Sequence, residues 1–137
     1  MPSPRTLNRI GSWAFIAVGA GHLASQLAAP QSPAHQRIVA AMQAFAIDMP
    51  GRTGNLYEYH VGFSVTMGFL LMAYGALALL SGRSQVEERP ILILHTLVAA
   101  TAATLSASFF FAVPLVLTLI ALAAYATALL QSRRNAH

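Results

Sequence analysis

The chain has 137 residues, of which 56% are hydrophobic and only 9% are charged, and its formal net charge is +4. Soluble domains carry about 25% charged residues, so this composition cannot build a water-facing surface. The positive charge comes from arginines alone, and no motif that reads nucleic acid accompanies them, so we expect no nucleic-acid partner. The absence of cysteine excludes disulfides, thiolate metal sites and cysteine nucleophiles.

Four apolar stretches with almost no charge occupy most of the chain: residues 10–28, 56–80, 91–109 and 113–130. A bilayer core about 30 Å thick needs roughly 20 apolar residues in a helix. All four stretches meet that length within the tolerance that tilt allows. We therefore predict an all-α integral membrane four-helix bundle that forms a single domain over residues 1–137.

The connection between the first two spans is long and contains a helix signal of its own. Ser32 is a good N-cap, and Pro33 suits the first helical position. Apolar residues then recur at helical spacing, namely Ile38, Met42 and Phe45. This pattern predicts a short amphipathic outer helix at about 33–47, lying at the membrane interface or folded over the mouth of the bundle. Pro50 and Gly51 are expected to end it.

The placement of arginines predicts how the chain is oriented in the membrane. Four spans put both termini and the middle loop on one side, and arginines favour the cytoplasmic side. We therefore predict an inner-membrane, multi-pass protein with both termini in the cytoplasm and the long connection outside. The predicted inner side holds Arg5, Arg9, Arg83, Arg89, Arg133 and Arg134, whereas the outer side holds Arg37 and Arg52.

Polar side chains inside the spans are the candidate site, because hydrocarbon offers them no partner. His22 and His60 each lie five or six residues inside the outer end of a span, which places them roughly 8 to 9 Å below the outer interface. Consecutive spans are antiparallel, so we expect the two imidazoles to face each other at one level in a hollow open to the outside. Gln26 and Tyr57 are expected nearer the mouth, and Ser64 on the same inward face.

Two further ionisable residues stand apart from this pair. Glu58 is about 160° from His60 around the helix, so it reaches the same hollow only if the first turn of the span is bent. Otherwise it caps the start of the span, where a helix N-terminus favours a carboxylate. His95 lies near the cytoplasmic end of the third span and shares a face with small side chains, so it is expected to point into the bundle.

This pattern predicts an outward-facing polar pocket that binds a lipophilic small molecule, since such sites are apolar with few convergent polar groups. The predicted ligand contacts are Gln26, Tyr57, Ser64 and His95. If the protein is an enzyme, a point that the sequence leaves open, the chemistry is expected to need only proton transfer, as in an isomerase or cyclase. The predicted catalytic residues are His22 and His60 as acid and base, with Glu58 tuning one of them.

Two other interpretations stay open. The chain is an accessory subunit of a larger membrane complex, or a homo-oligomer, if the histidines serve only as interhelical hydrogen-bonding groups. It is a haem or metal carrier if His22 and His60 serve as the ligands, as axial ligands in the case of a haem. The sequence requires no cofactor, and no cluster of soft ligands predicts a metal site.

The first half of the chain carries a series of short motifs: Gly21-His22, Pro30, Met42, Gly51-Arg52, Tyr59 and Gly62-Phe63. In this series the chain resembles a family of small bacterial four-span membrane proteins to which no reaction is assigned. The resemblance implies the four-span fold and a bacterial inner membrane, and it implies no substrate.

Overall fold

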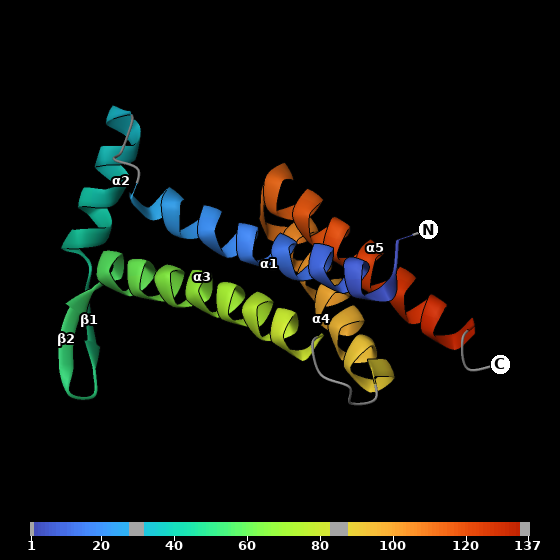
Figure 1. Ribbon diagram of the computed structural model, residues 1–137. Coiled ribbons are helices and arrows are strands. Elements are labelled where there is room, and N and C mark those ends of the chain that lie inside the picture. Colours follow the sequence, from blue (N-terminus) through green and yellow to red (C-terminus); the bar gives the residue numbers. More distant parts are fainter. Residues whose placement is uncertain (1, 28–31, 83–87, 135–137) are drawn as a thin grey trace.

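The computed structural model describes residues 2–27, 32–82 and 88–134. Within these ranges the chain forms five helices and one two-stranded hairpin (Figure 1). In chain order the elements are α1 (Pro4–Leu27), α2 (Pro33–Ala44), β1 (Ala46–Met49), β2 (Arg52–Asn55), α3 (Leu56–Ser81), α4 (Glu88–Phe109) and α5 (Ala112–Arg134). Ala28 at the end of the predicted first span, Pro30 of the resemblance and Arg83 of the orientation argument lie outside the described residues.

Among the described helices, three are long and apolar enough to cross a membrane: Leu56–Ser81 in α3, Arg89–Phe109 in α4 and Ala112–Ser132 in α5. They match three of the predicted spans. α1 covers most of the remaining predicted span, the first in chain order (10–28). It is not among the three helices that are long and apolar enough to cross a membrane. Its second half contains His22, Ser25 and Gln26, whose polar side chains lower its hydropathy.

Side-chain caps explain where two of the helices begin. The Ser32 hydroxyl accepts a hydrogen bond from the His35 amide at 3.2 Å, and Pro33 occupies the first turn of α2, as predicted. At the start of α3, the Asn55 side-chain oxygen accepts the Glu58 amide at 2.9 Å. α3 therefore begins as a regular, capped helix, and its first turn is not unwound.

The outer connection differs from the predicted helix over 33–47. α2 ends at Ala44, and the residues that follow form the antiparallel hairpin β1–β2. Pro50 and Gly51 make its two-residue turn, in which Gly51 adopts φ 84°, a left-handed conformation that glycine accepts without strain. The Phe45 carbonyl then accepts the amide of Leu56 at 3.0 Å, which joins the base of the hairpin to α3.

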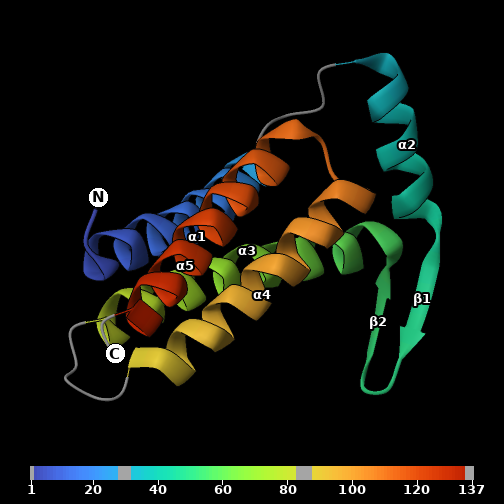
Figure 2. The same ribbon diagram turned by 90° about the vertical axis from the view of Figure 1, so that its right-hand side faces the viewer.

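The long helices pack in a fixed order. α1 lies against α3 on one side and against α5 on another, and α4 packs on α5 (Figure 2). The core at their meeting point combines two large rings with small side chains that let the helices approach. Its buried members are Ala14, Phe15, Ala99, Ala121 and Tyr125.

Candidate functional site

Glycines bring α1 and α3 into direct backbone contact. A Cβ added to Gly19 would lie 2.5 Å from the Gly68 carbonyl oxygen, and one added to Gly75 would lie 2.6 Å from the Ser12 carbonyl oxygen. Further along, the side-chain amide of Asn8 donates to the carbonyl of Ala78 at 2.9 Å. The facing residue numbers add up to 87 in the first two contacts and to 86 in the third. This constant sum fixes an antiparallel register.

The register places the two predicted histidines at different depths. It sets His22 level with Val65, and it sets His60 level with Leu27, the last residue of α1. The two histidines are therefore five residues apart along the helix pair, or about 7.5 Å at 1.5 Å per residue. His22 is half-buried and His60 is exposed. The expectation that the two imidazoles face each other at one level is wrong, because the register separates them by five residues along the helix pair.

The other residues predicted for the outer pocket also differ in depth and burial. Ser64 is buried on the side of α3 that faces α1, while Gln26 and Tyr57 are half-buried nearer the ends of their helices. The Nε2 atom of His22 is buried and has no hydrogen-bond partner among the described residues. A buried nitrogen without a partner is uncommon and costly, so this position has hydrogen-bonding capacity that the described residues leave unused.

Glu58 lies in the first turn of α3, the second of the two positions that the sequence left open for it. Its carboxylate oxygen Oε2 lies 3.1 Å from Nη2 of Arg52, and both side chains are at least half exposed. This ion pair joins the hairpin to the first turn of α3. Because the turn is regular, Glu58 points toward the hairpin, and its hydrogen bonds among the described residues are with Arg52 and Asn55.

His95 is 5% exposed and lies in a network of polar and aromatic side chains. Its Nδ1 atom is 2.7 Å from the Tyr74 hydroxyl and its Nε2 atom is 3.4 Å from the Ser81 hydroxyl. Its ring stacks on Tyr125 at a centroid distance of 4.9 Å. Both ring nitrogens therefore have partners, and His95 connects α4 to α3 far from the predicted outer pocket.

Tyr125 extends this network to α1. Its hydroxyl lies 3.2 Å from the hydroxyl of Ser12, which donates to the Asn8 carbonyl at 2.7 Å. Sequence reasoning assigned no role to Tyr74, Asn8 or Ser12. The signal that points to Tyr74 is a tyrosine in the middle of an apolar span, because a buried tyrosine hydroxyl needs a partner.

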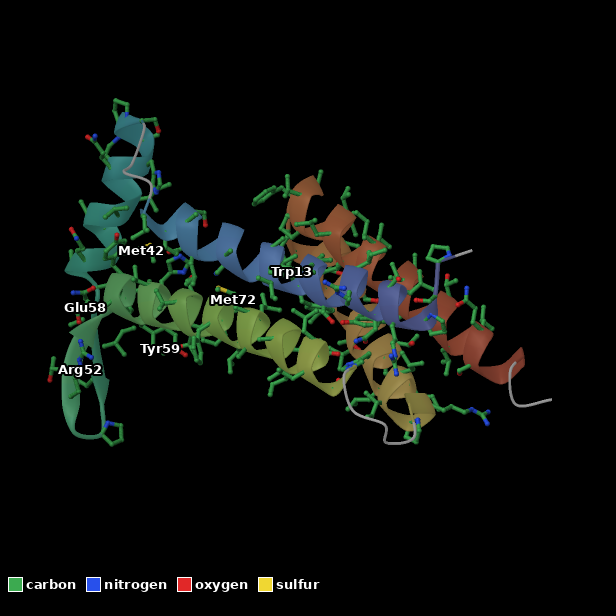
Figure 3. The ribbon with its side chains drawn as sticks, viewed as in Figure 1. Trp13, Met42, Arg52, Glu58, Tyr59 and Met72 are labelled. Atoms are coloured by element: carbon green, nitrogen blue, oxygen red, sulfur yellow. The ribbon has the colours of Figure 1, made fainter. Side chains whose placement is uncertain are left out.

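A groove opens on α3 where the helix leaves the hairpin. It encloses about 270 Å³. Its hairpin end is polar, with Arg52, Asn55 and Glu58, and the part that follows α3 is formed mainly by Tyr59, Gly62, Phe63 and Thr66. Figure 3 shows Arg52, Glu58 and Tyr59 gathered at this junction. Neither His22 nor His60 lines the groove.

The described residues do not favour a metal or haem at the predicted pair. They contain no group of three or more histidine, aspartate or glutamate side chains that could hold a metal ion. Axial haem ligands stand opposite each other across one iron, and the offset between His22 and His60 does not fit that arrangement. The geometry instead offers a groove with an ionic end and an apolar end.

Comparison with known proteins found no family model, no curated protein and no solved structure that matches this chain. The resemblance to four-span bacterial membrane proteins therefore stays a prediction.

Proposed function

We propose that this chain is a four-span inner-membrane protein that binds a lipophilic, bilayer-soluble molecule in the groove on α3. α1 serves as the fourth span in this proposal. Its 24 residues cover about 36 Å at 1.5 Å per residue, which exceeds the thickness of the bilayer core. α1 also packs along α3, and His22 and Gln26, two of the residues that lower its hydropathy, are half-buried.

The arginine distribution supports an orientation with both termini in the cytoplasm. On that orientation the hairpin and the groove lie at the outer face. The groove then sits at the boundary between lipid head groups and acyl chains, where a molecule from the bilayer reaches it without crossing water.

The observation that carries the proposal is the division of the groove into an ionic end and an apolar end. Arg52 uses one side of its guanidinium for Glu58 and keeps further N–H donors exposed. A ligand with a carboxylate, phosphate or carbonyl head suits this end, since such groups accept charge-assisted hydrogen bonds. An apolar tail suits the surface of Gly62 and Phe63. We propose binding rather than a named reaction, because the groove contains no histidine.

Two open glycines make a matched test of the groove. An added Cβ meets nothing within 4 Å at either Gly62, which lines the groove, or Gly21, which is exposed on α1 and lies outside it. We expect photolabelling of the reconstituted protein by a diazirine-tagged fatty acid to fall by about tenfold in Gly62→Leu, since overfilling a site costs about 1–3 kcal/mol. Gly21→Leu should label like the parent protein.

Mass spectrometry of the labelled peptides locates the cross-link. Labelling within residues 52–66 that disappears in Gly62→Leu supports the proposal. Equal labelling of both variants, or labels spread evenly over all the helices, would show that the fatty acid samples the lipid-facing surface without a site.

A further inference from the structure

α2 is a helix that the protein itself does little to stabilise. It has 12 residues and none of them is buried. Helices of this length are marginal in water even when their sequence favours helix formation. The hairpin beside it has only two strands, and a lone two-stranded hairpin is also marginal. Both elements therefore need a surface that covers them.

The apolar residues of α2 form one face that is only partly covered. Val39 and Met42 are half-buried, and α2 has contacts with α3. Beside them, Ile38 is 59% exposed, and Phe45, the C-cap residue directly after α2, is 61% exposed. Gln36 lies about 160° away from Ile38 around the helix, so the opposite face is polar.

The direction of α2 relative to the long helices indicates what covers this face. α2 runs across the end of α1 and α3, and the hairpin extends from the same junction in the opposite direction (Figures 1 and 2). Helices that cross a bilayer stand along its normal, so an element set across their ends lies in the plane of the membrane surface.

The surroundings of α2 also suit lipid. Tyr59 and Phe63, in the first two turns of α3, are more than half exposed, and aromatic side chains favour the membrane interface. α2 contains Arg37 and no acidic residue, so its charge is compatible with lipid phosphates.

We propose that α2 docks through Ile38 and Phe45 on the lipid head-group boundary of the membrane surface at which α1 ends and α3 begins. The inference rests on the proposed insertion of the long helices into a bilayer. The sequence leaves open whether this helix lies at the membrane interface or folds over the mouth of the bundle. The inference selects the membrane interface. The groove on α3 then stays open to the lipid.

Tryptophan scanning tests this docking directly, because Trp13 is the only tryptophan of the chain. In a Trp13→Phe background, Ile38→Trp and Gln36→Trp place the probe on opposite faces of α2. The protein is reconstituted in vesicles that contain lipids brominated near the head-group end of the acyl chain. Amphipathic helices bury their apolar face about 5–10 Å into this boundary, so we expect strong quenching and blue-shifted emission for Ile38→Trp. Gln36→Trp should be little quenched.

A third variant separates failure of the docking from failure of the membrane insertion. Phe69 is 63% exposed near the middle of α3, so Phe69→Trp in the same background should be quenched by lipids brominated deep in the chain. Quenching at position 69, with positions 38 and 36 equally unquenched, would overturn the docking of α2 and leave the membrane insertion standing. No quenching at position 69 would overturn both.

Cysteine labelling provides a second measurement. The chain has no cysteine, so Ile38→Cys and Gln36→Cys each carry a single thiol. Docking on lipid predicts that a membrane-impermeant maleimide reacts several-fold more slowly at position 38 than at position 36, at every protein-to-lipid ratio. Protection of position 38 that vanishes when the protein is diluted in lipid would show that a second copy of the chain covers this face, and it would overturn the proposal.

Discussion

The two halves of the α1–α3 pair differ in whether their polar side chains have hydrogen-bond partners. In the terminal half, formed by residues 4–15 and 72–81, the polar side chains of the network have partners: Asn8 donates to the Ala78 carbonyl, and Tyr74 and Ser81 bond to His95 of α4. In the hairpin half, formed by residues 16–27 and 56–71, the buried Nε2 of His22 has none among the described residues, and His60 is exposed. A satisfied network fixes the packing of helices, whereas unused hydrogen-bonding capacity is available to a ligand. The difference is that polar contacts join the helices in the terminal half, whereas in the hairpin half the pair is joined by the Gly19–Gly68 approach and the Nε2 atom of His22 stays without a partner among the described residues.

Filling a glycine contact of the terminal half should have the largest effect. A side chain at Gly75 meets the Ser12 backbone, which cannot move aside as a flexible side chain can. We expect Gly75→Leu to reduce the free energy of unfolding by an amount near the top of the range of about 1–3 kcal/mol for overpacked interiors. Thermal unfolding in mild detergent, followed by circular dichroism, measures the change. Gly21→Leu is the control, and an equal loss in both variants would contradict the close approach at Gly75.

Replacing His95, which bonds to the terminal half from α4, and His22, which lies in the hairpin half, by leucine should have different effects on stability. His95→Leu leaves the Tyr74 hydroxyl without its partner and should cost about 1–3 kcal/mol. His22→Leu removes a buried nitrogen that has no partner among the described residues, so the unfolding midpoint should stay the same or rise, by up to about 1 kcal/mol. The same melting experiment compares the two. A destabilised His22→Leu would mean that the two halves do not differ in the way described above.

The smallest change in stability is expected at the ion pair of the groove. Arg52 and Glu58 are largely exposed, and exposed pairs contribute about 0–1 kcal/mol. Arg52→Ala should therefore melt almost like the parent protein, while its labelling by the diazirine-tagged fatty acid falls. Arg37→Ala, on the exposed surface of α2, removes the same charge outside the groove and is the control. Unchanged labelling in Arg52→Ala would show that Arg52 does not take part in binding the fatty acid.

Helix positions were predictable from the sequence because they depend on local composition. Apolar stretches set the three membrane-length helices, and Ser32 with Pro33 set the start of α2. The inward face of α3 was also predictable in part, since Ser64, Gly68 and Gly75 are buried as a stripe of small residues predicts.

The relative depth of residues on two helices was not predictable in the same way. The depth depends on which glycines of the two helices meet. Counting residues from the predicted ends of two spans, as was done for His22 and His60, does not determine it. His60 precedes the buried Ser64 by one helical turn and so shares its face by angle, yet its side chain is exposed. The hairpin was not predicted because Pro50 and Gly51 are equally typical of the end of a helix and of a two-residue turn. Ile47 lies about 180° from Ile38 around a helix, so it does not continue the apolar face of α2.

The close contact between Gly19 and Gly68 has a consequence for biosynthesis. On the four-span arrangement, α1 is synthesised first although its own hydropathy does not place it among the helices apolar enough to cross a membrane. It meets its packing partner only when α3 has been made, and α3 begins about 30 residues after α1 ends. α1 is then expected to enter the lipid as a helical pair with α3, and ribosome-bound chains that stop before α3 should leave α1 extractable from the membrane.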